Sequence, residues 1–376
     1  MTAKRRPRAP QPAGRMLDGR MLAAALLVLG AAPLARAAPE PARVQKTTAG
    51  GPQLVGERFR REVQVEVAEK REEQIAGLLR LLELGAPPEE KPDLEFRLAE
   101  LYADKSRFYF FRSQEKTDAI ARAESEEAKV ALREAQKEED ERSKLWARKA
   151  LEVYARIRRA HPDYARMPEV LFALGQSHWT RGEYAKALKP YEDLIRQYPD
   201  SPLVSEAWIA FGEFFFNGTE DVDADVIKAL KSYQKAAEDT RSRVYGFALY
   251  KQGWCYYNMA EWRKALEKFE ATVLYSQLSE EMSGENKIAL GREAQADWVR
   301  TYVHIGTPRD ARFEIARLLD VERCEGRCLV LLEDLANRWF GEGYFVEAAD
   351  LYRQLVRLEP ESLRNPLRQG RVVDIA

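Results

Sequence analysis

The sequence predicts an all-α fold, an α-solenoid in which pairs of short helices stack in a row. Its abundant alanine, leucine, glutamate and arginine residues favour helices, and 32% of the residues are charged. The pattern is clearest over residues 171–202, which form two short amphipathic segments joined at Gly182. Small residues (Gly175, Ala187) lie where the helices must approach closely, and Tyr191 fills the gap between them. One such hairpin cannot bury its own apolar faces, so copies of it are expected.

The first 37 residues (1–37) have the pattern of a signal peptide. Residues 1–20 are basic, and residues 21–34 form an apolar run that is too short for a membrane span. Small residues then predict cleavage between Ala37 and Ala38. An uncleaved anchor helix is the alternative. We therefore expect an exported protein with no stable membrane span after cleavage.

The charge balance argues against some partners. The whole chain has a formal net charge of −1, from 60 basic and 61 acidic residues. Residues 1–37 hold seven of the basic residues and one acidic residue, so the remainder has 53 basic and 60 acidic residues, a net charge of −7. Such a domain has no electrostatic reason to bind nucleic acid or an anionic membrane surface.

The segments that follow set up the repeats. Residues 38–55 are rich in proline, glycine and threonine and predict a flexible leader. Residues 56–92 predict an N-terminal helix that ends before two prolines. Residues 93–167 contain both helices of a first repeat, but a charged insert, about residues 104–144, replaces the turn between them.

The insert itself predicts a pair of long helices. An equal division places its apex near Ser125, a good N-cap residue that is followed by acidic residues. At about 1.5 Å per residue, this pair would extend roughly 25–30 Å beyond the array. A single kinked helix with a solvated charged face is the alternative.

Further copies of the hairpin follow along the chain. Residues 168–290 predict three units, residues 291–361 predict two more, and residues 362–376 predict a C-terminal cap or a truncated repeat. A stretched linker is expected at 276–290. The close-approach position of the first helix is small in all but the fourth unit; it is occupied by Gly175, Gly212, Gly253, Val299 and Ala336.

These recurring positions resemble tetratricopeptide repeats. The connecting segments 161–175 and 198–212 are similar to those of exported envelope proteins of Gram-negative bacteria, of the outer-membrane assembly, Tol-associated or gliding-motility type. The resemblance implies a right-handed superhelix. It also implies a non-catalytic scaffold whose first helices line a concave groove for protein or peptide partners.

The groove positions that the family implies are unusually aromatic in this chain. The predicted partner-binding residues are Phe96, Phe172, Trp179, Ile209, Phe216, Tyr250, Trp254, Tyr257 and Phe340. Aromatic side chains anchor many protein interfaces. The alternative is that tight superhelical winding packs these rings against the neighbouring repeat.

Three cysteines are present. Cys324 and Cys328 are four residues apart, and an oxidising compartment would permit a disulfide between them. Two free thiols are the alternative. Cys255 follows Trp254 in a helical segment and is expected to be a packed thiol.

No catalytic pattern stands out. The three histidines are isolated, and the sequence has no phosphate-binding loop, so neither a metal nor a cofactor is predicted. We expect a periplasmic scaffold that binds protein partners of a cell-envelope machine. The alternative is an accessory subunit that holds glycan or peptidoglycan near an enzyme. The sequence leaves homo-oligomerisation open.

Overall fold

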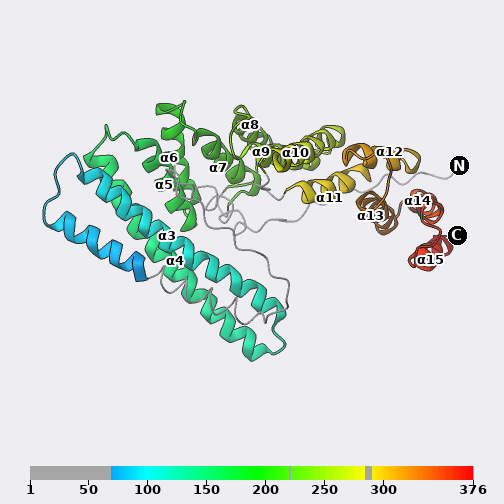
Figure 1. Cartoon of the computed structure of the whole chain (residues 1–376), viewed down its shortest axis with the longest axis horizontal. Helices are drawn as coiled ribbons and strands as arrows, with labels where there is room; N and C mark the ends of the chain where they lie inside the picture. Colours follow the sequence, from blue (N-terminus) through cyan, green and yellow to red (C-terminus); the bar gives the residue numbers. More distant parts are fainter. Residues whose placement is uncertain (1–68, 220–221, 284–289, 376) are drawn as a thin grey trace, which may run out of the picture. The chain divides into compact units, whose positions relative to one another are not determined.

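A computed structural model describes residues 69–219, 222–283 and 290–375, and every regular element in these ranges is a helix (Figure 1). The predicted signal peptide and leader lie outside these ranges. Two compact units meet between Ala207 and Trp208, and we describe each by itself. Consecutive helices pack together within each unit, as an α-solenoid requires. The predicted fold class is therefore confirmed.

The unit that ends at Ala207 contains the long hairpin and the repeat hairpin within residues 167–197. The N-terminal helix is described from residue 69 to residue 83. The other helices, in order, are α3 (Lys91–Arg122), α4 (Glu126–Ala160), α5 (Met167–Thr180), α6 (Tyr184–Gln197) and the first turn of α7 (Val204–Asn217).

The turn between α3 and α4 lies near Ser125, as the sequence predicted. Ser125 is the N-cap of α4, and its hydroxyl accepts a hydrogen bond from the Ala128 backbone amide at 3.2 Å. At the other end of the hairpin, the two halves of the first repeat meet, and Phe96 packs edge-on against Tyr154 at 5.7 Å between ring centroids. The insert therefore extends a repeat without preventing its two helices from pairing.

The unit that begins at Trp208 continues the array. It contains the rest of α7, then α8 (Val226–Ala236), α9 (Tyr245–Asn258), α10 (Trp262–Ser283), α11 (Gly291–Tyr302), α12 (Pro308–Leu318), α13 (Arg327–Glu342), α14 (Phe345–Leu358) and α15 (Asn365–Ile375). Part of the expected linker at 276–290 is instead helical, because α10 continues to Ser283. No glycine or proline interrupts this sequence before Gly284.

Glycines in the first helices receive aromatic rings from the second helices. A Cβ atom added to Gly253 would lie 2.6 Å from the Phe269 ring, and one added to Gly175 would lie 2.4 Å from the Tyr191 ring. Both separations are shorter than any normal contact, so only glycine permits these approaches. Phe269 and Tyr191 are fully buried. The pairing of small and large residues is thus the closing contact of the repeat.

The turns α5–α6, α9–α10 and α13–α14 share one backbone conformation. Gly182, Ala260 and Gly343 have φ angles of 77°, 58° and 86°. After each of them, the next amide donates a hydrogen bond five residues back along the preceding helix, for example from Glu261 to the Tyr256 carbonyl at 2.9 Å. This is the Schellman arrangement, which normally uses glycine. Ala260 therefore adopts a conformation that alanine disfavours.

A buried ion pair joins α7 and α9 in the second unit. Lys251 Nζ lies 3.0 Å from Glu213 Oε1, and both side chains are almost fully buried. The Tyr233 hydroxyl also donates to Glu213 Oε1, at 2.6 Å, and Asn217 Nδ2 donates to Glu213 Oε2 at 3.1 Å. Each carboxylate oxygen therefore has a partner, which a buried charge requires.

Candidate interaction surface

The predicted partner-binding residues divide into two groups by exposure. Six are between 0 and 8% exposed: Phe96, Phe172, Trp179, Ile209, Tyr250 and Trp254. The other three, Phe216, Tyr257 and Phe340, are half-buried. A partner could therefore contact almost none of the side-chain surface of the first group, whereas part of each aromatic ring of the second group is accessible to it.

Neighbouring rings account for much of the burial. Phe172 packs against Tyr191 at 5.5 Å between centroids, and Trp179 packs against Tyr184 at 4.9 Å. In both pairs the second ring comes from the second helix of the same repeat. These contacts lie within one repeat and not against the neighbouring repeat, so the groove prediction and its alternative both stay open.

One group of side chains in the second unit combines exposure with polar chemistry. We call it the Tyr257 cluster. It consists of Tyr250, Trp254 and Tyr257 on α9, Trp262 on α10, Asp297 and Arg300 on α11, and His304 just after α11. It lies where the third and fourth units of the array meet.

The polar part of the Tyr257 cluster is built around Asp297. The Tyr250 hydroxyl donates to Asp297 Oδ2 at 2.7 Å, and Arg300 Nη1 lies 2.8 Å from Asp297 Oδ1. Burial raises the pKa of Asp297, although the hydrogen bond from Tyr250 and the charge of Arg300 oppose the rise. The Arg300 guanidinium also lies 5.3 Å from the centroid of the Trp254 ring, within cation–π range. Asp297 thereby fixes the arginine beside an aromatic face.

The aromatic part is built around Tyr257. Its ring contacts Trp254 and Trp262 with centroids 5.3 and 5.1 Å apart. His304 stacks on Trp262 at 4.0 Å, and its Nε2 lies 3.4 Å from the Tyr257 hydroxyl. Burial lowers the pKa of His304, which favours the neutral imidazole at neutral pH. The result is a rigid stack of rings beside a cation.

The residue types of the Tyr257 cluster are common in protein-binding surfaces. Tyrosine, tryptophan and arginine are the residues that most often carry the binding energy of protein interfaces. Burial raises the pKa of the Tyr250 and Tyr257 hydroxyls, so both stay protonated at neutral pH and can donate hydrogen bonds. Within the described ranges, no group of three or more His, Cys, Asp or Glu residues could hold a metal ion.

Sequence reasoning missed four members of the Tyr257 cluster: Trp262, Asp297, Arg300 and His304. Asp297 lies outside the groove positions, so the groove pattern carries no signal for it. Arg300 and His304 occupy groove positions nine and thirteen of the fourth unit in the register set by Val299, but only aromatic residues were sought at those positions. A search for any residue that stacks or donates hydrogen bonds would have found both. Trp262 belongs to a second helix, so the groove pattern carries no signal for it.

The cysteines form one disulfide. Cys324 and Cys328 are bonded, with their Cα atoms 5.0 Å apart, at the start of α13. Gly326 between them has a φ angle of 51°, a conformation that few other residues adopt. Cys255 is a free, fully buried thiol, and burial raises its pKa. The disulfide therefore fixes the first turn of α13, and the third cysteine is part of the core.

Comparison with known families agrees with this geometry. Two segments, residues 168–213 and 247–274, match models of the tetratricopeptide repeat. The first spans α5, α6 and most of α7, and the second spans most of α9 and the first half of α10. The chain contains tetratricopeptide repeats. No curated protein matches the sequence.

The tetratricopeptide matches include one side of the Tyr257 cluster. Tyr250, Trp254, Tyr257 and Trp262 lie inside the second matched segment, while Arg300 and His304 belong to the following hairpin. Tetratricopeptide repeats suggest a protein-interaction scaffold. Among the helices that the structure describes, none combines the length and the apolar character needed to cross a membrane.

Proposed function

We propose that this protein is an exported, non-catalytic scaffold that binds a protein partner of a cell-envelope machine through the Tyr257 cluster. The observation that carries the proposal is the half-buried Tyr257 ring, which is held between Trp254, Trp262 and His304 with Arg300 nearby. A rigid aromatic group loses little conformational entropy when a partner covers it.

Periplasmic location is the second part of the proposal. It is supported by the export-signal pattern of residues 1–37 and by the Cys324–Cys328 disulfide, because disulfides persist in oxidising compartments. N-terminal sequencing of the protein recovered from a periplasmic fraction tests it directly. An N-terminus at Ala38 is the expected result, and recovery from the cytoplasm with residues 1–37 retained would contradict it.

Partner binding is tested by replacing Tyr257 with a photo-crosslinking phenylalanine analogue in cells. We expect covalent adducts with one or a few envelope proteins, identified by mass spectrometry. The matched control is Tyr256, the residue before Tyr257 on α9. Its ring contacts Lys264 and its hydroxyl lies near Gln234, away from the Tyr257 cluster. The same adducts from both positions, or none from Tyr257, would argue against this surface.

Affinity is tested by Tyr257→Ala once a partner is identified. Loss of a central aromatic anchor costs about 2 kcal/mol or more, roughly a thirtyfold weaker complex. Tyr256→Ala should leave the affinity within twofold. Trp254→Ala is a poor test, because Trp254 is only 8% exposed and packs on Phe269, so its loss would damage the core. Circular dichroism and thermal unfolding confirm that each variant is folded.

A further inference from the structure

The imidazole of His304 lies among aromatic rings and not beside a carboxylate. Its ring stacks on Trp262 and lies 5.8 Å from the Tyr257 ring, measured between centroids. Among the residues that the structure describes, no acidic side chain forms an ion pair with it, whereas His178 Nδ1 lies 2.7 Å from Glu183 Oε2. Protonation of His304 would therefore place a positive charge in the Tyr257 cluster without an anion paired to it.

The cations around His304 already have acidic partners. The neighbouring elements carry these titratable or charged groups: Tyr257 on α9, Glu261 and Lys264 at the start of α10, Asp297 and Arg300 on α11, Asp310 on α12, and Asp334, Arg338 and Glu342 on α13. The ion pairs among them are Lys264 with Glu261 at 3.3 Å, Arg300 with Asp297 at 2.8 Å, and Arg338 with Asp334 at 2.9 Å. Burial is nevertheless the dominant influence on His304 and lowers its pKa, so these groups do not supply the missing anion.

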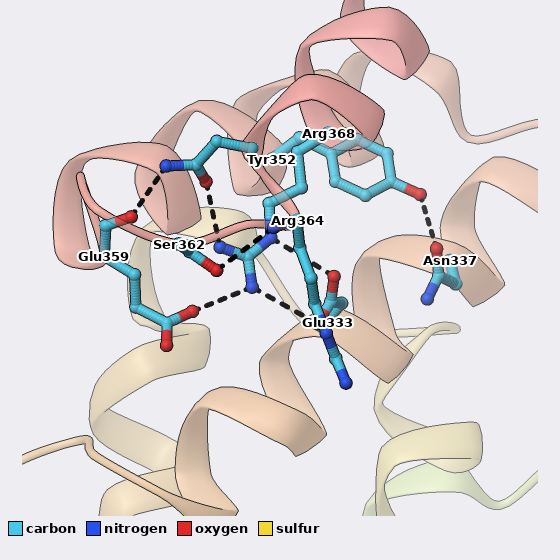
Figure 2. A network of polar contacts seen from close by, with 8 residues as sticks. Glu333, Asn337, Tyr352, Glu359, Ser362, Arg364 and Arg368 are labelled. Atoms are coloured by element: carbon cyan, nitrogen blue, oxygen red, sulfur yellow. Dashed lines mark hydrogen bonds and ion pairs between the residues drawn. The ribbon is translucent and has the colours of Figure 1, made fainter.

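Another polar network of this unit, around Arg368, keeps its charges in acid (Figure 2). Arg368 is only 2% exposed; its guanidinium donates to Glu333 on α13 at 3.2 Å and to Glu359 just after α14 at 2.8 Å. These hydrogen bonds, with one from Arg364 to Glu333 at 2.6 Å, outweigh the effect of burial and hold the pKa of Glu333 below its usual value. Mild acid therefore leaves the contact between Arg368 and Glu333 intact while it protonates His304.

We propose that the partner covers His304 with an apolar, uncharged surface, so that the complex forms with the neutral imidazole and dissociates in acid. This inference rests on the function proposed for the Tyr257 cluster. His304 and Trp262 are half-buried in the free chain, so a partner that covers them removes the remaining water from the imidazole. The rings of Tyr257 and Trp262 beside it are complementary to apolar groups. A charged imidazole would then be buried without an anion, which is costly.

The direction of the pH dependence follows from this burial. Binding favours the neutral imidazole, so a protonated chain must release the proton of His304 when the complex forms. The affinity is therefore constant above the pKa of His304 in the free chain and falls below it, by at most about tenfold per pH unit. Because burial already holds that pKa below the ordinary value of about 6.5, the complex has its full affinity at neutral pH and weakens only in acid.

The test uses the purified chain with a photo-crosslinking phenylalanine analogue in place of Tyr257, mixed with isolated cell envelopes buffered at about pH 7.5 or about pH 5. We expect the adduct yield to be lower by roughly threefold or more at the lower pH. His304→Gln, which keeps a polar side chain that cannot titrate, should give equal yields at both pH values. The matched control is His178→Gln, at a histidine outside the cluster, which should keep the loss. Circular dichroism confirms that each variant is folded at both pH values.

Three results would overturn this inference: equal yields at both pH values, a higher yield in acid, or a loss in acid that persists in His304→Gln. The last result would assign the effect to Asp297 or Glu342, whose pKa values burial raises. Each of the three leaves the function proposed for the Tyr257 cluster standing, whereas an absence of adducts at both pH values would contradict both proposals.

The titration itself can be measured without a partner. The tryptophan fluorescence of the free chain should fall in acid, because an imidazolium quenches the indole on which it stacks, and His304 stacks on Trp262. His304→Gln should abolish this fall. The same fluorescence change in the wild type and in His304→Gln would also overturn the inference.

Discussion

The repeats and the long α3–α4 hairpin pair their helices by different chemistry. In the repeats, one ring closes on one glycine, as Phe269 does on Gly253. In the long hairpin, hydroxyl groups bridge the helices: Ser106 Oγ donates to the Ser143 carbonyl at 2.8 Å, and Ser143 Oγ donates to the Ser106 carbonyl at 3.0 Å. Farther along, Ser113 donates to Asp140 at 2.6 Å. Helices of 32 and 35 residues can spread their contacts, whereas helices of 14 residues cannot.

This difference predicts that stability is concentrated in single residues of the repeats and distributed along the hairpin. The largest effect should come from Phe269→Ala. It removes the ring from Gly253 and from its contacts with Tyr250 and Trp254, at 5.8 and 6.0 Å. We expect a loss of about 3–5 kcal/mol in the free energy of unfolding, measured in urea. Phe313→Ala, at a ring that is 62% exposed, is the control and should change little.

The second effect reverses the usual preference for alanine in helices. Gly253→Ala places a Cβ atom 2.6 Å from the Phe269 ring and should cost about 1–3 kcal/mol. Gly341→Ala meets no atom within 4 Å and should instead stabilise the protein by up to about 1 kcal/mol. Thermal unfolding of both variants decides the matter. Equal effects would show that the ring does not close the repeat.

The hairpin should respond more weakly. Ser143→Ala removes the hydrogen bond that the Ser143 hydroxyl donates to the Ser106 carbonyl. The Ser106 hydroxyl can still donate to the backbone carbonyl of residue 143, so we expect the free energy of unfolding to fall by only about 1 kcal/mol. Ser106→Ala should cost a similar amount. Because the two hydroxyls are also 3.2 Å apart, the double variant should cost less than the sum. A loss above 3 kcal/mol from either single change would contradict a distributed interface.

The smallest effect concerns the turns. Ala260 has a φ angle of 58°, where Gly182 and Gly343 occupy the matching positions of other repeats. Ala260→Gly should stabilise the protein by about 0.5–1 kcal/mol, since relief of the left-handed strain exceeds the entropy that glycine gains in the unfolded chain. Gly182→Ala should destabilise by a similar amount. Urea unfolding measures both, and a loss from Ala260→Gly would show that the turn carries no strain.

Much of the fold could be predicted because its signals are local. The spacing between Gly175 and Tyr191 predicted a helical hairpin. A serine followed by acidic residues predicted the N-cap of α4 at Ser125. The extra turns of α10 were signalled as well, by the absence of a helix breaker before Gly284, but the repeat pattern led us to expect a linker. These features depend on contacts between neighbours in the sequence.

The candidate site was harder to predict because it depends on contacts between residues that lie far apart in the sequence. The same aromatic position is almost covered at Trp179 and half-open at Tyr257, and both residues have the same register in their repeats. Whether a ring is covered depends on the side chains that the adjacent helices bring to it. The stack of His304 on Trp262 depends on residues 42 positions apart, beyond the range of any single-repeat pattern.

The redox state of the disulfide at the start of α13 indicates the compartment in which the chain folded. The sequence contains three cysteines, and the bonded form leaves one thiol, Cys255, which native packing shields from solvent. A chain that folds in an oxidising compartment therefore resists alkylation when native and takes up one alkyl group when denatured without a reductant. A chain that stays reduced takes up three. The mass of the denatured, alkylated protein thus reports the compartment of origin without any fractionation of the cell.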